Sequence, residues 1–358
     1  MFRKHLFFIL LSVVILGSYA QETELNYIVG ETIKDRHQYS NLLSIAEDGK
    51  GGTVVVRSYF SGIVLKPKGY LVEHYNKDLE LLSEYNYKLK DANFVEAYVK
   101  NGQVYLLFLE YDYSKLAYEY IVHRSPFTEF NFTKELLLSI PSNAVQQPLD
   151  RNYYNRNFAS GFTTSVLFND EKSAFVITTH YKKRKENKHV IHVFDGSLRK
   201  LMEHDFSDQV EEKNYAFENV VFSADLTNVY LVGKAYFKKK RFEAKERKYQ
   251  YELVRISGTT KNIQAFDTPG KFPEALKPIF KGNELLCLGF YADRKDNRYN
   301  GIVYYNLEPS SLVIESEKFN PFSDQFMTDK FGRGDETTIK DLVFKGMDPS
   351  IIKNLAYL

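Results

Sequence analysis

Basic side chains gather in two short stretches of a chain whose total charges are nearly balanced. Residues 182–188 contain five basic residues and one acidic residue, and residues 238–248 contain seven basic and two acidic residues. Arginine presents a planar fork of donors that suits carboxylate or sulfate, and lysine adds a mobile cation. The two stretches therefore predict a surface that binds an acidic ligand.

A long linker adds arginine and tyrosine to this candidate surface. Residues 141–161 form the longest predicted connection, and loops of this length inside compact domains are often functional. Tyrosine offers a flat amphipathic ring that suits sugars and peptides. A plainer interpretation stays open, because lysine-rich turns are often only solvated and prevent pairing between sheet edges. The candidate binding residues are Lys182, Lys183, Arg184, Lys185, Lys238, Lys239, Lys240, Arg241, Arg151, Tyr153, Tyr154 and Arg156.

The first 20 residues predict a secretory signal peptide. Arg3 and Lys4 precede an apolar run at 6–16, and Ser18 and Ala20 supply small residues at the cleavage positions. Without Arg3 and Lys4 the 48 basic residues become 46, which equals the 46 acidic residues. We expect an exported protein of the periplasm, cell surface or extracellular space, with no transmembrane segment after cleavage. Its formal neutrality argues against nucleic acid as a partner.

The histidines and the cysteine do not predict a metal site or a cofactor. His189 and His192 are three residues apart, and on a strand their side chains point to opposite faces, so they cannot bind one ion together. His180 is expected to lie near His192 across the hairpin. Cys287 lies within an apolar strand, and we expect a buried small side chain there rather than a nucleophile.

Enzymatic chemistry is the alternative to binding. The sequence has no G-x-S-x-G nucleophile motif, no Walker loop and no G-x-G-x-x-G motif. Carboxylate pairs that cleave glycosides depend on distance in space, so sequence spacing does not exclude them. Glu110 and Asp112 are the first pair to consider. A carbohydrate-active hydrolase or lyase with carboxylates at a channel mouth is therefore kept as an alternative.

These side chains need a scaffold, and residues 163–206 show its plan. Segments 163–168, 174–181, 189–194 and 201–206 are rich in β-branched and aromatic residues, and polar turns separate them. The first basic stretch fills the turn between the second and third segments. A meander this short leaves an apolar face uncovered, so it must stack on similar units.

The same plan recurs about five times. Segments that resemble the second strand begin at Thr53, Val104, Ala174, Val229 and Glu284, which are 51, 70, 55 and 55 residues apart. Four strands in a period near 50 residues are typical of β-propeller blades, although an irregular pair of β-sandwiches is an alternative. We predict an all-β fold with a single propeller domain over 21–358. Its blades would span approximately 39–90, 93–140, 162–207, 217–267 and 274–319.

The chain after the fifth unit predicts a short helix and part of a sixth blade. Ser323 is a candidate helix N-cap. Residues 338–344 resemble the first strand of a sixth unit, and residues 27–32 are a candidate strand to complete the last blade. Either the ring is incomplete or the chain has been cut short. The apolar stripe of the helix would consist of Phe322, Phe326 and Phe331.

The signal peptide, the blades rich in Tyr, Phe, Lys and Asn without tryptophan, and SEKFNPFSDQFMTDKF leading into IKDLVF support a resemblance. Together they resemble a group of uncharacterised secreted β-propeller-like proteins of Bacteroidetes-type bacteria. The resemblance covers most of the mature chain, and SEKFNPFSDQF is its most specific part. It implies an exported compartment and a propeller fold, and it brings no activity. In that group a glycine-rich hairpin and another full blade are expected after IKDLVF, and this sequence differs there.

Three functional hypotheses follow from the sequence. The leading one is an exported non-enzymatic propeller that binds an acidic ligand through a basic rim face. Its partner would be an anionic polysaccharide, a lipopolysaccharide or an acidic protein surface. The second is the carbohydrate-active hydrolase or lyase, and the third is a truncated remnant with no activity.

Overall fold

The structure is a computed structural model that describes residues 39–61, 66–89, 92–145, 164–183, 186–206, 213–237, 249–293 and 299–323, together with Val29 and Phe326. The chain divides into two compact units, one up to Lys88 and one from Leu89 onward. Each unit is described by itself. No helix among the described residues is long and apolar enough to cross a membrane.

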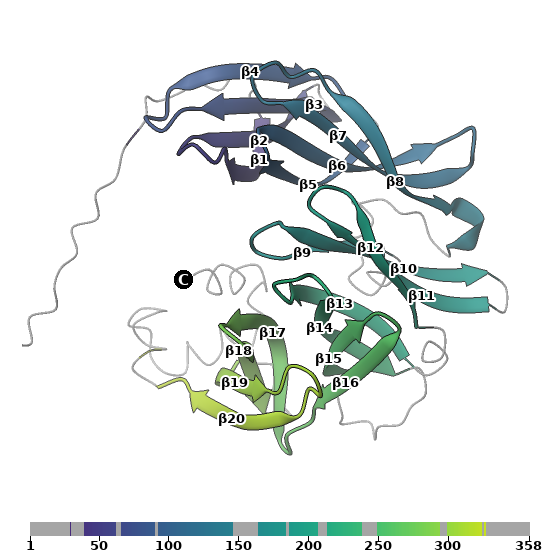
Figure 1. The fold of residues 1–358 in the computed structure, drawn as a ribbon, viewed down its shortest axis with the longest axis vertical. Helices are drawn as coiled ribbons and strands as arrows, with labels where there is room; N and C mark the ends of the chain where they lie inside the picture. Colours follow the sequence, from purple (N-terminus) through teal and green to yellow (C-terminus); the bar gives the residue numbers. More distant parts are fainter. Residues whose placement is uncertain are drawn as a thin grey trace, which may run out of the picture. The chain divides into compact units, whose positions relative to one another are not determined.

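The first unit contains one antiparallel sheet of four strands in chain order, which we call the first sheet (Figure 1). Its buried side chains include Val54, Val56 and Val72, and alternation along the strands places these valines on one face. On the other face the Arg57 Nε donates to a Glu73 carboxylate oxygen at 3.0 Å. The strands are β1 (Tyr39–Glu47), β2 (Thr53–Ser61), β3 (Lys66–Tyr75) and β4 (Leu81–Tyr87).

Within the described residues, the second unit contains four more antiparallel sheets of four strands, each again in chain order. The second sheet has β5 (Ala92–Lys100), β6 (Gln103–Asp112), β7 (Ala117–Pro126) and β8 (Thr133–Pro141), followed by the short helix η1 (Ser142–Ala144). The third has β9 (Thr164–Phe168), β10 (Ala174–Lys183), β11 (Glu186–Asp195) and β12 (Lys200–Asp205). The fourth has β13 (Lys213–Phe222), β14 (Asn228–Phe237), β15 (Tyr249–Ser257) and β16 (Thr260–Phe266). The fifth has β17 (Lys271–Lys281), β18 (Glu284–Asp293), β19 (Gly301–Leu307) and β20 (Ile314–Pro321).

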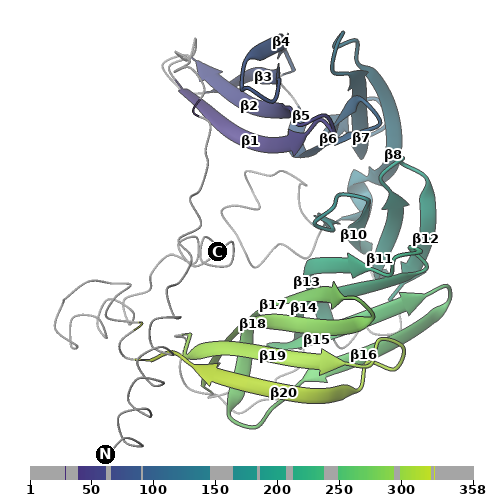
Figure 2. The ribbon, with the colours of Figure 1, turned by 60° about the vertical axis from the view of Figure 1, so that its left-hand side comes forward.

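Consecutive sheets of the second unit bury their apolar faces against each other. Tyr98 of the second sheet and Phe175 of the third belong to one core cluster, and Val193 of the third and Tyr215 of the fourth belong to the next. A further cluster joins Leu253 of the fourth sheet to Cys287 of the fifth. The first strands also meet, because β13 contacts both β9 and β17 (Figures 1 and 2). This face-to-face stacking covers the apolar face that each four-stranded sheet would otherwise expose to water.

A bulge interrupts the first strand of the fourth and fifth sheets, and a glycine faces each bulge. The register shifts between Phe217 and Asn219 in β13, and between Pro273 and Ala275 in β17. Gly233 pairs with Phe217 at the first shift, and Gly289 pairs with Leu276, one residue beyond the second. At both glycines a Cβ atom would collide with a backbone carbonyl oxygen of the bulged strand. The bulged residues are Glu218 and Glu274, so the irregularity places a carboxylate on each strand.

The structure confirms the predicted all-β fold and the plan of four-stranded units. The four segments predicted within 163–206 are strands β9 to β12, and the five predicted second strands are β2, β6, β10, β14 and β18. The number of blades and the single domain over 21–358 stay predictions. The Ser323 hydroxyl oxygen accepts a bond from the Phe326 N–H at 3.1 Å, whereas most of the short helix predicted there lies outside the described residues. Phe331, residues 338–344 and, apart from Val29, residues 27–32 lie outside the described residues.

Two details of the third sheet were predicted wrongly. The turn expected over 182–188 is shorter, because Lys182 pairs with Asn187 and Lys183 pairs with Glu186. This longer ladder fixes the register of the hairpin, so His180 faces His189 and not His192. The polar side chains had suggested a loop. Strand pairing depends on backbone groups, so polar side chains do not prevent it.

Candidate functional site

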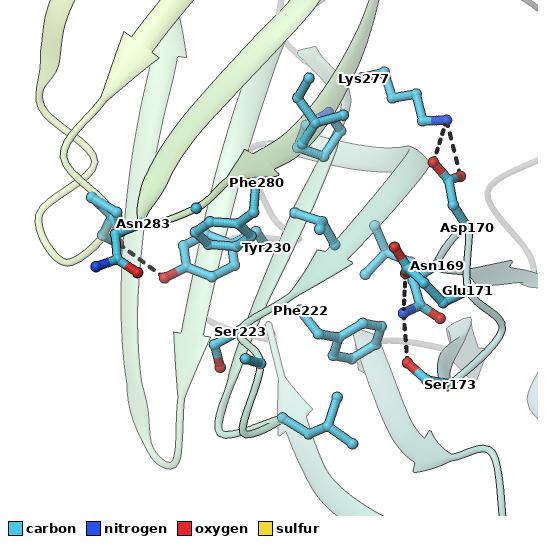
Figure 3. A pocket seen from close by; sticks show the side chains of 18 residues that line it. Asn169, Asp170, Glu171, Ser173, Phe222, Ser223, Tyr230, Lys277, Phe280 and Asn283 are labelled. Atoms are coloured by element: carbon cyan, nitrogen blue, oxygen red, sulfur yellow. Dashed lines mark hydrogen bonds and ion pairs between the residues drawn. The ribbon is translucent and has the colours of Figure 1, made fainter.

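Three turns of the second unit surround one pocket of about 690 Å³ (Figure 3). They join the first and second strands of the third, fourth and fifth sheets, around Asp170, Ser223 and Gly282. We call this side of the three sheets the pocket end. Three equivalent turns meet there because the three sheets have the same strand order and stack on one another.

The floor of the pocket is apolar and aromatic. Phe222 and Tyr230 are almost fully buried, whereas Phe280 is half-buried. The rings of Tyr230 and Phe280 lie edge to face, with centroids 5.3 Å apart. The Tyr230 hydroxyl donates to the carbonyl oxygen of Pro309 at 3.2 Å, which fixes the ring. Burial, the main cause, raises the pKa of this phenol.

The rim of the pocket carries opposite charges. Lys277 Nζ lies 2.9 and 2.7 Å from the two carboxylate oxygens of Asp170, although the two residues are 107 positions apart (Figure 3). Both side chains are well exposed, at 47% and 66%. Glu171 is also exposed and adds a second carboxylate beside the first. The ion pair connects β17 of the fifth sheet to the turn of the third sheet.

The turn that carries Asp170 is closed by its own side chains. The Asn169 side chain accepts a bond from the Ala174 N–H at 3.1 Å and donates to Ser173 Oγ at 2.8 Å. It also donates to the Glu171 carboxylate at 2.9 Å. Lys172 has a positive φ of 49°, which an asparagine-led turn accommodates. These local bonds fix the shape of the turn that presents Asp170 and Glu171, and Lys172 of the same turn also donates to the Ala97 carbonyl oxygen of the second sheet at 2.9 Å.

The second strands lead from the pocket end to the opposite end of the sheets, which we call the basic end. Strands β10, β14 and β18 each have ten residues and begin next to the pocket-lining turns. At about 3.3 Å per residue they finish roughly 30 Å away, at Lys183, Phe237 and Asp293. The first basic stretch spans the end of β10, and the second follows the end of β14 in the sequence.

The predicted binding residues fall almost entirely outside the described part of the chain. Lys182 is exposed on β10, and Lys183 is the last residue of that strand. Neither lines the pocket, which lies at the other end of β10. The residues that lie outside the described ranges are Arg184, Lys185, Lys238, Lys239, Lys240, Arg241, Arg151, Tyr153, Tyr154 and Arg156.

A network of lysine, glutamate and tyrosine lies at the basic end of the fourth and fifth sheets. Lys234 Nζ is 3.0 Å from Glu218 and lies over the rings of Tyr249 and Tyr251, at 5.1 and 5.3 Å from their centroids. The Tyr251 hydroxyl lies 2.6 Å from the Glu218 carboxylate and 2.7 Å from the Glu274 carbonyl oxygen. The Tyr249 hydroxyl donates to the Glu274 carboxylate at 2.5 Å. The network therefore bridges two neighbouring sheets.

Burial and charge shift the pKa values in this network. Burial is the main cause that raises the pKa of Tyr251 well above its usual range, and the Glu218 carboxylate acts in the same direction. Burial alone would lower the pKa of Lys234, but Glu218 and the neighbouring tyrosines outweigh it and raise this pKa. Lys234 is thus a fixed cation and Tyr251 a fixed neutral donor at ordinary pH.

Neither carboxyl of the predicted pair has a raised pKa. Glu110 lies 3.1 Å from His123 and 3.8 Å from Lys134, and Asp112 accepts bonds from the Ser114 and Lys115 backbone. Hydrogen bonding from His123 is the main cause that lowers the pKa of Glu110, and the bond from Ser114 is the main cause that lowers that of Asp112. A general acid needs a raised pKa, so neither carboxyl fits that role.

The histidines and the cysteine lie where strand alternation puts them. His189 packs on the face toward the fourth sheet, with its ring 5.8 Å from Phe217, and His192 lies on the opposite face with Glu203 at 3.2 Å. The prediction that they cannot share an ion is consistent with this placement. Cys287 is fully buried, and its burial raises the pKa of the thiol, as expected for a packed side chain.

Sequence reasoning missed both the pocket and the network. The pocket depends on Asp170 and Lys277, which lie in different units of the repeat, so no local spacing joins them. The network had a signal that could have been found. Glu218 and Glu274 precede the second strands that start at Asn228 and Glu284 by ten residues each, so both occupy the same position of the repeat.

Comparisons with known proteins concern the fold alone. No family model and no curated relative matches the chain. Among solved structures it is similar to the β-propeller domain of the Trilobed protease from Pyrococcus furiosus, with 10% identity and a TM-score of 0.42, over 81% of this chain and 72% of that one. It is also similar to an acylaminoacyl peptidase of Pyrococcus horikoshii, with 8% identity and a TM-score of 0.42, over 80% of this chain. The match spans only 40% of that peptidase.

Proposed function

We propose that the chain is a non-enzymatic binding protein of the β-propeller type that takes an acidic ligand at its basic end. One observation carries this proposal. Strands β10 and β14 begin at one shared pocket and both run for ten residues, so their far ends lie on the same side of the stacked sheets. The sequence continues from these two ends into the two basic stretches.

The charge of these stretches favours an acidic partner. Their net charges of +4 and +5 belong to a mature chain that is formally neutral, so the remainder of the chain carries an equal negative charge. A local excess of cations attracts anions over about a Debye length even when the whole molecule is neutral. The proposed partners are an anionic polysaccharide, a lipopolysaccharide or an acidic protein surface, met after export to the periplasm, cell surface or medium.

The proposal includes a propeller of five blades with part of a sixth. The repeated strand order and the stacking of consecutive sheets support the blades. The outer face of the fifth sheet supports the additional strands, because Leu288 and Ile302 on it are 37% and 42% exposed. Phe322 begins to cover this face, with its ring 6.2 Å from that of Phe290. A following strand such as 338–344 would bury these side chains.

The decisive experiment compares two variants of equal net charge. In the first, seven basic residues of the two stretches are changed to serine: Lys182, Lys183, Arg184, Lys238, Lys239, Lys240 and Arg241. In the matched control, seven exposed lysines from elsewhere are changed to serine: Lys50, Lys77, Lys88, Lys134, Lys200, Lys281 and Lys318. Retention on heparin-like and uronate matrices is then measured against salt concentration.

We expect the first variant to elute at much lower salt than the control, because exposed charge pairs are screened and depend on local charge density. Equal elution of the two variants would show that the basic stretches do not bind the matrix. The same proteins serve to test the hypothesis of an inactive remnant, which predicts non-cooperative thermal unfolding of the unsubstituted chain. The hydrolase or lyase hypothesis gains no support from Glu110 and Asp112, whose pKa values are lowered.

A further inference from the structure

We propose that the pocket between the third, fourth and fifth sheets binds a peptide segment that carries one large apolar side chain next to a lysine or arginine. This site lies at the pocket end and is separate from the proposed acidic-ligand site at the basic end. Its chemistry is also opposite, because carboxylates predominate at the rim. The two proposals therefore succeed or fail independently.

The size and the floor of the pocket fit an apolar side chain. A volume of about 690 Å³ falls within the range of ligand-binding cavities. Phe222 and Tyr230 form a rigid base, because both are buried and the Tyr230 hydroxyl is fixed on Pro309. Phe280 is half-buried and its ring borders the cavity (Figure 3). An aromatic or large aliphatic group placed there would cover apolar surface that now faces water.

The rim of the pocket fits a cation. Asp170 and Glu171 both present exposed carboxylates, and among the lining residues Lys277 is the single basic one. Lys277 shows where an ammonium group is held, since its Nζ lies 2.7 Å from the nearer Asp170 oxygen. An ion pair this exposed contributes little, so a cation from a ligand can replace it at low cost.

The distribution of these groups favours a peptide over a simple cation or an apolar molecule. The carboxylates lie on the third-sheet turn, whereas the aromatic floor belongs to the fourth and fifth sheets (Figure 3). A ligand must therefore join a positive group to an apolar group across the width of the pocket. Neighbouring residues of an extended peptide supply this combination. An acidic peptide would meet Asp170 and Glu171 and should be rejected.

The first test uses three short peptides and the full chain. Acetyl-Lys-Phe-Lys-amide carries both features, acetyl-Lys-Ser-Lys-amide lacks the apolar group, and acetyl-Glu-Phe-Glu-amide reverses the charge. Dissociation constants are measured by calorimetry at low salt. We expect the first peptide to bind at least about tenfold more tightly than either of the others. Equal affinities for all three peptides would overturn the proposal.

The second test compares variants of the pocket rim whose expected effects on peptide affinity have opposite signs. Asp170→Asn combined with Glu171→Gln should weaken binding of acetyl-Lys-Phe-Lys-amide at least about fivefold, because both carboxylates lose their charge. Lys277→Met should instead tighten binding about two- to fivefold, because it removes the cation that competes for Asp170. All three positions are exposed, so these variants should fold.

Two controls make the result specific to the pocket. Asp78→Asn combined with Glu80→Gln removes the same charge from exposed positions that do not line the pocket, and it should leave the affinity unchanged. Retention of the Asp170 and Glu171 variant on heparin-like matrices should also be unchanged, because that readout reports the basic end. If Lys277→Met weakens peptide binding, or if the control weakens it as much as the pocket variant, the proposal is wrong.

Discussion

The two ends of the stacked sheets hold their polar side chains in different ways. At the pocket end two acidic turns are closed by their own side chains: Asn169 closes its own turn, and Asp225 accepts bonds from Ser223 and Thr227, although Lys172 and Tyr230 also bond to neighbouring sheets. At the basic end the bonds cross strands and sheets, as when Tyr251 of the fourth sheet contacts the Glu274 carbonyl oxygen of the fifth. The acidic turns of the pocket end are closed by their own side chains, whereas the tyrosine network of the basic end joins two sheets.

This difference predicts which end can change freely. A bond within one turn affects only the few residues that it spans, whereas a bond between sheets is lost only with part of the packing. Substitutions at the basic end should therefore destabilise the fold, and substitutions at the rim of the pocket should not. A ligand that rearranges rim side chains would then leave the stacked sheets intact. Measurements of the free energy of unfolding for variants at the two ends test this contrast.

The largest expected effect is a loss of stability in acid that depends on His189. Its ring is fully buried among aromatic side chains, with His180 at 5.9 Å and Tyr215 at 6.3 Å. Within the described residues neither ring nitrogen has a hydrogen-bond partner. Burial, with a smaller effect of His180, lowers the pKa of His189 to about 3. The folded state therefore excludes the proton that the unfolded chain binds near pH 6.5.

A lowered folded pKa gives stability that is present above pH 6.5 and lost as the pH falls toward 3. The loss attributable to His189 should be roughly 3–5 kcal/mol over this window. His189→Phe keeps an aromatic ring in the cluster and removes the titration, so its acid loss should be smaller by that amount. Urea unfolding at several pH values measures both proteins. Identical pH dependence would show that His189 does not control acid stability. Burial also lowers the pKa of His192, which should leave a smaller residual loss in the variant.

The next effect concerns the backbone at the bulge beside the network. Gly289→Ala places a methyl group against the Ala275 carbonyl oxygen and forces the β17 bulge to move. We expect a destabilisation of about 3 kcal/mol, measured as the free energy of unfolding. Gly258→Ala is the matched control, because its Cβ would meet no atom within 4 Å and only its φ of +57° is unfavourable. The control should cost about 1 kcal/mol, and equal costs would contradict the close approach at Gly289.

The third prediction addresses the bonds between the fourth and fifth sheets. Tyr251→Phe removes the contacts of a buried tyrosine with the partly exposed Glu218 carboxylate and with the Glu274 carbonyl oxygen. We expect a loss of about 1–2 kcal/mol in the free energy of unfolding. Tyr98→Phe is the matched control, because the Tyr98 hydroxyl is buried and has no hydrogen-bond partner within the described residues. That control should be neutral to within about 0.5 kcal/mol, so a similar loss in both variants would refute the role of the bonds.

Strands were predictable from the sequence because each one carries its own signal. The β-branched and aromatic residues of four segments, separated by polar turns, identified β9 to β12, and the recurrence of that plan identified the second strand of every sheet. The register of the third-sheet hairpin was not predictable in the same way. Lys182 and Lys183 have side chains typical of a loop, yet their backbone groups continue the ladder with Asn187 and Glu186.

Sites were much less predictable than strands, because they depend on contacts between units. The basic stretches were visible as local charge, although most of their residues lie outside the described part of the chain. The pocket had no such signal. Asp170 and Lys277 are ordinary exposed residues of two separate units until the stacking of three sheets brings them together. The sequence of a single repeat unit therefore predicts its four strands, but it does not predict a pocket that three units form together.

The smallest expected effect on the free energy of unfolding is at the rim of the pocket. It tests the prediction that substitutions there do not destabilise the fold. Asp170→Asn breaks the ion pair with Lys277 but leaves the Asn169 bonds that close the turn. Both charged side chains are well exposed, so the free energy of unfolding should change by less than about 0.5 kcal/mol. A double-mutant cycle with Lys277→Met should give a coupling energy of similar size. A coupling energy above about 1 kcal/mol would mean that the ion pair stabilises the contact between the third and fifth sheets. A ligand cation could not then replace Lys277 without destabilising the fold.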